Sequence, residues 1–166
     1  MIRPETADDL DAIRKVHVAA FPTAAESELV DALRVANNLD ASLVAEDEDS
    51  SAVVGHIAFS PVTIEGSEAL VGTGLAPVAV LPEFQHKGVG QQLIEAGLLT
   101  CEESGTDFVV VLGDPNYYSR FGFQPATNFE VGNEYGVGDE FMVIEFAAGC
   151  LAGGTAKYCQ QFKDLD

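Results

Sequence analysis

The spacing of hydrophobic residues changes in the middle of the chain. A largely β-branched apolar run from Val78 to Leu81 predicts a strand, and a polar turn over 82–88 follows it. Beyond the turn, apolar residues recur every three or four positions, which predicts a helix with one buried face. These apolar residues are Val89, Leu93, Ile94, Leu98 and Cys101. The segment therefore predicts a strand, a glycine-bearing turn and an amphipathic helix.

Patterns elsewhere predict further strands and a helical hairpin near the start of the chain. The first helix has Thr6 as its cap and ends at Pro22, and the second covers about 26–35. Pro77 interrupts one strand, so a bulge or an edge is expected there, because proline has no N–H for the sheet ladder. Residues 149–154 are expected to form a flexible connection before a short tail. The expected strands, in order and ending with the last one, are 2–4, 42–46, 52–62, 70–81, 108–112 and 140–146.

Length and apolar content predict one globular domain over residues 1–166. Apolar residues make up 47% of the chain, which is enough for a substantial core. No run approaches the ~20 apolar residues of a membrane span. The first residues also lack the basic-then-apolar order of a signal peptide. We therefore expect a cytoplasmic protein with no membrane partner.

The charge of the chain is strongly negative. Its 27 acidic residues oppose 8 basic ones, for a formal charge of −19, so nucleic acid is excluded as a partner. An acidic surface suits a halophilic protein, because screening over ~3 Å at 1 M salt removes most self-repulsion. Steering of a cationic substrate is the alternative, but the same screening would remove the long-range attraction. The acidic surface therefore says little about the substrate.

Two glycines, Gly88 and Gly90, lie where the turn enters the helix. The first N–H groups of a helix have no partner within it, and the helix dipole adds positive charge there, so a phosphate can bind. Glycines leave these donors unshielded. An ordinary turn is the alternative interpretation of the pair. A P-loop motif is missing, and Leu93 stands where a dinucleotide-binding motif needs its third glycine.

The spacing Gln85-x-x-Gly88-x-Gly90 resembles the acyl-CoA signature of the GCN5-related N-acetyltransferase (GNAT) superfamily. A second element, in which Tyr118 stands four residues before Gly122-Phe123, is similar to the Tyr-x-x-x-Gly-Phe element of that superfamily. The tail is similar to its YhbS-like branch. The resemblance covers nearly the whole chain, and the two motifs stand at a distance that fits the superfamily.

The resemblance implies an α/β fold with a mixed, mostly antiparallel and splayed sheet flanked by helices. It also implies acetyl-CoA as co-substrate, with its pantetheine arm inserted between the fourth and fifth strands. Backbone groups of the fourth strand would bond to this arm, and main-chain amides at the glycine turn would hold the pyrophosphate. The implied cofactor-binding residues are Val78, Ala79, Val80, Gln85, His86, Lys87, Gly88, Val89, Gly90, Asn116 and Arg120.

The implied reaction is acetyl transfer to an amine by direct attack on the thioester. The departing thiolate needs a proton, and Tyr118 occupies the position of the superfamily tyrosine that can donate one; Tyr117 is the rival donor. Arg120 contacts the coenzyme phosphates or pairs with a surface carboxylate. The acceptor amine, a small molecule or a protein, is left unidentified, and homodimer formation is left open. No metal is expected.

A general base is not evident, because the fourth strand contains no carboxylate or histidine. Glu26, with Glu28, is a candidate to anchor a water that relays the proton or to bind an ammonium group. Both are otherwise ordinary surface carboxylates of an acidic chain. His17 and His56 are interpreted as structural, since a lone histidine in an apolar segment is usually a satisfied core residue. An acyl-CoA-binding sensor without catalysis is therefore the alternative function.

The charge predicts that stability depends on salt. About nineteen uncompensated negative charges repel one another across the surface when salt falls well below molar, so the protein should lose structure there. Circular dichroism as a function of potassium chloride concentration measures this. Equal stability at about 0.05 M and about 2 M salt would contradict salt adaptation and favour substrate steering.

Overall fold

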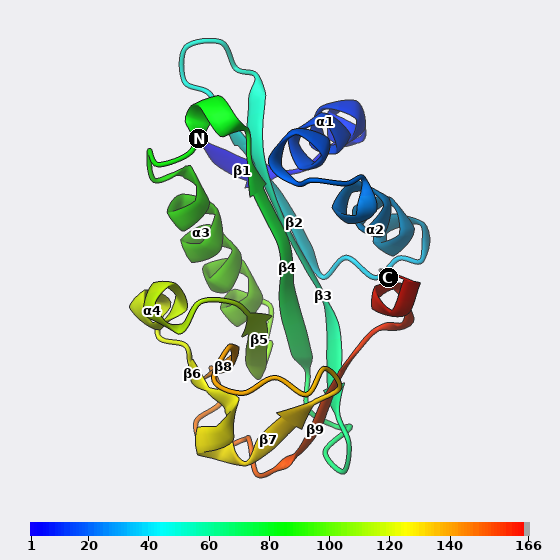
Figure 1. Ribbon diagram of the computed structural model, residues 1–166, viewed down its shortest axis with the longest axis vertical. Helices are drawn as coiled ribbons and strands as arrows, with labels where there is room; N and C mark the ends of the chain where they lie inside the picture. Colours follow the sequence, from blue (N-terminus) through cyan, green and yellow to red (C-terminus); the bar gives the residue numbers. More distant parts are fainter. Residues whose placement is uncertain (165–166) are drawn as a thin grey trace.

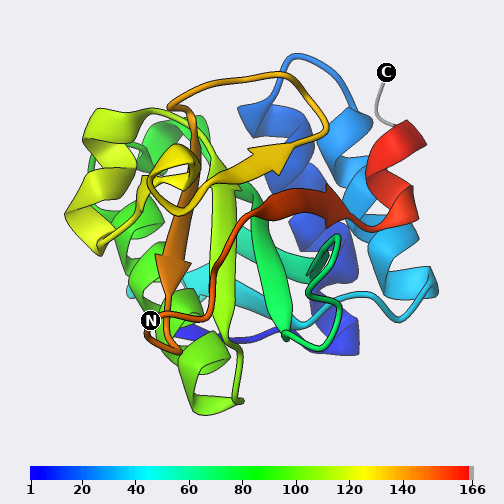
Figure 2. The same ribbon diagram turned by 90° about the horizontal axis from the view of Figure 1, so that it is seen from below.

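A nine-stranded sheet runs through the molecule, and helices cover both of its faces (Figures 1 and 2). The computed structural model describes residues 1–164. The strand order is β1-β2-β3-β4-β5-β8-β6, with β9 beside β3 and β7 beside β9. The strands are β1 (Ile2–Pro4), β2 (Ala41–Glu46), β3 (Val53–Ile64), β4 (Gly72–Val80), β5 (Phe108–Leu112), β6 (Gln124–Pro125), β7 (Val131–Asn133), β8 (Phe141–Glu145) and β9 (Gly154–Tyr158). The α-helices are α1 (Leu10–Ala20), α2 (Ala25–Val35), α3 (Val89–Glu103) and α4 (Pro115–Tyr118).

The helix α3 covers one face of the sheet, as its spacing predicts. Its buried residues are Leu93, Ile94, Gly97, Leu98 and Cys101. They join a core cluster with Ile57 and Phe59 of β3 and with Val109 and Val111 of β5. Gly97 has a particular role, because a Cβ atom there would lie 2.3 Å from Cε2 of Phe59. The missing side chain therefore lets α3 lie directly on the Phe59 ring.

The hairpin of α1 and α2 covers the opposite face, where Ile13 and Val30 pack on Val44 (Figure 1). Both helices lie close to the expected ranges. A one-turn 3-10 segment, Ala7–Asp9, precedes α1. The backbone N–H of Thr6 donates to the Asp9 carboxylate over 2.7 Å, which fixes the chain before this turn.

The strands β4 and β5 lie side by side only at their first residues. Gly72–Gly74 pairs in parallel with Phe108–Val110, and β5 continues along β8 beyond that point. The pairing of β4 with β3 shifts register at the Pro77 bulge and resumes at Val78–Val80. These last three residues therefore have β3 on one side and no strand of the described chain on the other. Both the bulge and the splayed sheet are confirmed.

The C-terminal part of the chain differs from its prediction. β8 is not the last strand, because Gly154–Tyr158 forms β9, which pairs antiparallel with β3 and parallel with β7. The strand β9 was not predicted because glycines precede it, and glycines are typical of turns. Gly149, Gly153 and Gly154 do have positive φ, but Gly154 is also the first residue of the strand. Figure 2 shows the tail after β9 beside α2. The expected flexible connection therefore leads into the sheet.

The contact between α3 and Phe59 predicts that Gly97→Ala lowers the free energy of unfolding, by up to about 2 kcal/mol. Alanine favours a helix by about 1 kcal/mol over glycine, but overpacking a core costs about 1 to 3 kcal/mol. Chemical denaturation measures the change. Leu99→Ala, on the exposed side of the same helix, is the control and should change stability little. A Gly97→Ala variant as stable as the parent would show that the Phe59 ring can shift to make room for the methyl group.

Candidate functional site

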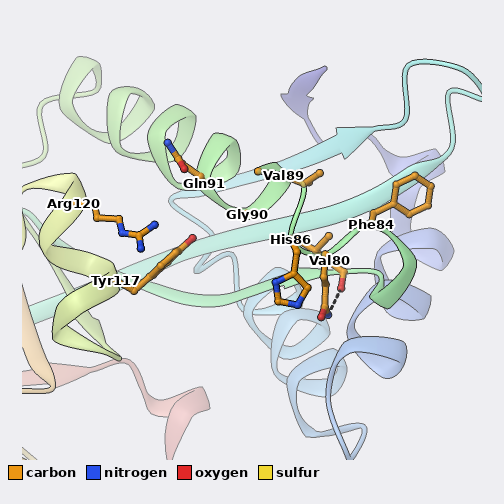
Figure 3. A pocket seen from close by; sticks show the side chains of 10 residues that line it. Val80, Phe84, His86, Val89, Gly90, Gln91, Tyr117 and Arg120 are labelled. Carbon is orange, nitrogen blue, oxygen red and sulfur yellow. Dashed lines mark hydrogen bonds between the residues drawn. The ribbon is translucent and has the colours of Figure 1, made fainter.

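A pocket of about 400 Å³ opens where β4 ends and α3 begins. Figure 3 shows Tyr117 and Arg120 facing Val80 and His86 across it. Seven of the residues implied by the sequence line this pocket: Val80, Gln85, His86, Gly88, Val89, Gly90 and Arg120. Phe84, Gln91 and Tyr117 line it as well. The sequence did not predict Phe84 and Gln91 as lining residues. Both flank the glycine motif, and this position was the one signal for them in the sequence.

The backbone of the turn offers several N–H donors to this pocket. His86 and Gly88 have positive φ values of 64° and 85°, and Lys87 between them does not. Such alternation of φ turns successive N–H groups toward one side. The first helical hydrogen bond runs from the Gln92 N–H to the Gly88 carbonyl over 3.0 Å. The N–H groups of Val89, Gly90 and Gln91 precede that bond and have no acceptor within the helix. The start of α3 therefore has free N–H donors for an anion, and these three residues are called the anion seat.

Gln85 holds the turn to the end of β4. Its side-chain Nε2 donates to the Val80 carbonyl over 3.0 Å, the dashed bond of Figure 3. The pocket wall and the strand edge thus form one unit. Gln85 serves the anion seat by fixing the turn, and its bond to Val80 joins the seat to the open edge of Val78–Val80.

Arg120 supplies positive charge to the pocket. Its guanidinium lies 5.5 Å from the centre of the Tyr117 ring, an arrangement that holds the side chain across the pocket. Within residues 1–164 it forms no ion pair, whereas Arg3, Arg14 and Arg34 are each paired with carboxylates. Arg120 is therefore available to an anion.

Tyr118 lies behind Tyr117, at the end of β5. The two rings meet edge to face with centroids 5.1 Å apart, and Tyr118 also packs on Phe123. The ring lies against the backbone at Gly113, where a Cβ would come within 2.3 Å of it. Burial raises the pKa of Tyr118 to about 12, so its hydroxyl keeps its proton at neutral pH. Tyr117 thus lines the pocket, whereas Tyr118 packs beside Gly113, just after β5 ends.

Apart from Val78, Ala79 and Tyr118, three implied residues do not line the pocket. Lys87 turns toward Phe84, with its Nζ 5.4 Å from the ring centre, and borders a separate hollow beside the acidic turn 46–49. Asn116 is exposed, and its backbone N–H bonds to the Asp114 side chain. Glu26 lies in the first turn of α2, on the other side of the sheet. The positive groups that line the pocket are therefore the free backbone amides of the turn and Arg120.

Comparison with known proteins agrees with this geometry. Residues 1–126 match the family model described as an acetyltransferase (GNAT) domain. The chain is 38% identical over 165 residues to the uncharacterized N-acetyltransferase YhbS of Escherichia coli K12, which covers 98% of each chain.

Two solved structures are similar over nearly the whole chain. The YhbS structure from Escherichia coli in complex with CoA superposes with a TM-score of 0.92 at 34% identity, covering 100% of this chain and 93% of that one. A GNAT family acetyltransferase from Brucella melitensis in complex with acetyl-CoA gives a TM-score of 0.81 at 39% identity, covering 98% and 97%. The splayed sheet and its anion seat thus define an acyltransferase-type fold. The chain belongs to the GNAT acetyltransferase family.

Two other kinds of feature are absent from the described residues. None of the helices in the described chain is long and apolar enough to cross a membrane. Among residues 1–164, no three histidine, cysteine, aspartate or glutamate side chains gather in a way that could hold a metal ion.

The anion seat predicts that Gly90→Val weakens CoA binding at least about tenfold, because the new side chain projects into the seat and blocks its donors. A Cβ at Gly90 has room, with Tyr117 Oη at 3.7 Å and Val80 Cγ2 at 3.8 Å, and needs no positive φ. Gly88 is a poorer probe, because its φ of 85° strains any branched residue.

Calorimetry of CoA binding measures the effect of Gly90→Val. Gly132→Val is the matched control, because a Cβ there meets only Thr155 Oγ1 at 3.9 Å, in β7 and outside the pocket. A folded Gly90→Val protein with the affinity of the parent would remove the basis for placing a phosphate at the start of α3.

Proposed function

We propose that this protein transfers an acetyl group from acetyl-CoA to an amine. The observation that carries the proposal is the open edge of Val78–Val80, which leads directly from the anion seat into the split between β4 and β5. The complexes of the two similar structures with CoA and with acetyl-CoA support it. A ligand with a pyrophosphate at one end and an extended amide-bearing arm at the other matches both features.

The coenzyme is proposed to lie along one continuous path. Its pyrophosphate accepts hydrogen bonds from the amides at the start of α3, and Arg120 offsets its charge. The pantetheine amides pair with the edge-facing backbone groups of Val78–Val80 as an added strand would, apart from the Val80 carbonyl, which already accepts from Gln85. The thioester then reaches the junction of β4 and β5, where Tyr118 packs on Gly113.

In the proposed reaction the uncharged amine attacks the thioester carbonyl. The new C–N bond forms, the C–S bond breaks, and the amine loses one proton. The thiolate of CoA takes a proton from the Tyr118 hydroxyl, which regains one from solvent before the next turnover. Burial raises the pKa of this phenol, so it is protonated when the thiolate appears.

The setting of the reaction is proposed from the charge. We infer a cytoplasmic protein adapted to high salt, because 27 acidic residues oppose only 8 basic ones and the resulting self-repulsion is screened in concentrated salt. Glu26 remains a proposed anchor for water or for the acceptor ammonium group, on the face of the sheet opposite the pocket.

The proposed acid role predicts that Tyr118→Phe lowers the acetyl-transfer rate by about 10-fold to 1,000-fold, with CoA affinity unchanged within a few-fold. The variant loses one proton donor and keeps the ring. Tyr117→Phe is the matched control and should lower the rate less, since its hydroxyl lies at the phosphate seat.

Turnover of acetyl-CoA with a panel of primary amines, together with calorimetry of CoA, measures both quantities. Full turnover by Tyr118→Phe when chemistry limits the rate would reduce Tyr118 to a packing residue. Tight CoA binding without transfer to any amine would contradict the proposed function and favour an acyl-CoA sensor.

A further inference from the structure

A second hollow adjoins the coenzyme pocket and runs along α3. It has a volume of about 380 Å³, within the range of small-molecule sites, about 300 to 1,000 Å³. Arg120 lines both this hollow and the pocket at the start of α3. The hollow is called the α3 groove, and Arg120 joins it to the pocket. Its apolar walls come from α3, from the turn after α4 and from the end of β8 and just beyond: Leu98, Leu99, Phe121, Ile144 and Phe146.

One face of α3 borders both hollows. Gln91 lines the pocket, and its side-chain amide donates to Glu95 over 3.0 Å. Glu95, Leu99 and Glu102 line the groove, and steps of three or four residues place them on the same side of the helix as Gln91. Gln91 and Leu99 are eight residues apart, which is about 12 Å along the helix axis. A nucleoside attached to a pyrophosphate at the anion seat can cover that distance.

Charge is distributed unevenly along the α3 groove. Arg120 is the only basic residue among the described residues that line it, and it stands at the end shared with the pocket. The carboxylates of Glu95 and Glu102 border the groove itself. A phosphate is therefore attracted to Arg120 and repelled from the remainder, whereas a group with N–H donors suits the carboxylates. The groove thus fits a ligand with a phosphate at one end and a ring bearing N–H donors at the other.

The walls of the groove suit a flat aromatic ring. Phe121 and Phe146 are partly buried and pack against the core cluster around α3, so the core supports their rings. Leu99 is 55% exposed, although it lies on the same helix face as the two carboxylates. Nucleic-acid bases stack on aromatic side chains whatever their sequence, because every base has a π face. An adenine base in the groove would cover Leu99 and lie against these aromatic side chains.

We propose that the α3 groove holds the adenosine end of CoA and that Arg120 binds its ribose phosphate. The inference rests on the proposed function, because it completes the path of the same coenzyme beyond the pyrophosphate. In CoA the adenosine and the pantetheine arm leave the pyrophosphate in opposite directions. The arm follows the edge of β4, and the base follows α3, with its amino group facing the carboxylates of Glu95 and Glu102.

Contact between the base and the groove is tested by NMR on the CoA complex, without any assay of activity. The protein is labelled at its leucine, isoleucine and valine methyl groups. We expect nuclear Overhauser effects from the two ring C–H protons of adenine to the methyl groups of Leu99 and Ile144. A bound CoA whose adenine protons show no contact with these methyl groups would place the base outside the groove and overturn the inference.

The role of Arg120 is tested by calorimetry with CoA and with dephospho-CoA, which lacks the ribose phosphate. The parent should bind CoA about 10-fold more tightly than dephospho-CoA, because a charge-assisted hydrogen bond is lost with that phosphate. Arg120→Gln should reduce this preference to about 2-fold or less. Both ligands keep the pyrophosphate, so any loss of its attraction to Arg120 cancels in the ratio.

Lys87→Gln is the matched control, because it also removes one positive charge near the turn but borders a separate hollow. It should keep the preference of the parent for CoA. An Arg120→Gln protein that keeps this preference, or a parent that has none, would overturn the inference alone, since the anion seat and the edge of β4 would still hold the coenzyme. Failure of the parent to bind CoA at all would overturn the proposed function, and the inference with it.

Discussion

The site depends on the short stretch over which β4 and β5 pair. Hydrogen bonding between the two strands ends at Gly74, after which β5 follows β8 and β4 follows β3 through the Pro77 bulge. The ring of Tyr158 lies against Gly74, where a Cβ would come within 2.6 Å of it. Val78–Val80 therefore keeps an edge of backbone donors and acceptors that no other strand of the described chain satisfies. Such an edge is a binding site for an extended, amide-bearing ligand.

The sheet separates two kinds of chemistry at this edge. On the side of α3, free backbone amides and Arg120 line a pocket within a chain of net charge −19, and these groups are suited to an anion. On the side of α1, a buried chain of polar side chains runs from His17 to Glu5. Apart from Glu5, these polar side chains come from α1, β2 and β3, and one of them, His56, is the register partner of Ala79 in β4.

The sequence predicted the parts of the site whose signals are local. The period of α3, the glycines before it and the proline in β4 each act within a few residues, and all appear where expected. Two features depended on distant pairing. β9 begins at a glycine and is a strand because β3 and β7 lie beside it, and His17 meets His56 across 39 positions of sequence. The sequence also did not show which of Tyr117 and Tyr118 lines the pocket. Residues i and i+1 of a helix point in different directions, so the answer depends on how the helix is oriented.

The central claim is that a coenzyme occupies the open edge of β4 and the start of α3 together. Amide hydrogen exchange, with and without CoA, measures this at each backbone N–H. The account predicts slower exchange on CoA binding at the edge-facing amides of Val78–Val80 and at Val89–Gln91, with little change in β1 and β2. Protection at neither segment in a protein that binds CoA would place the coenzyme elsewhere and contradict the account.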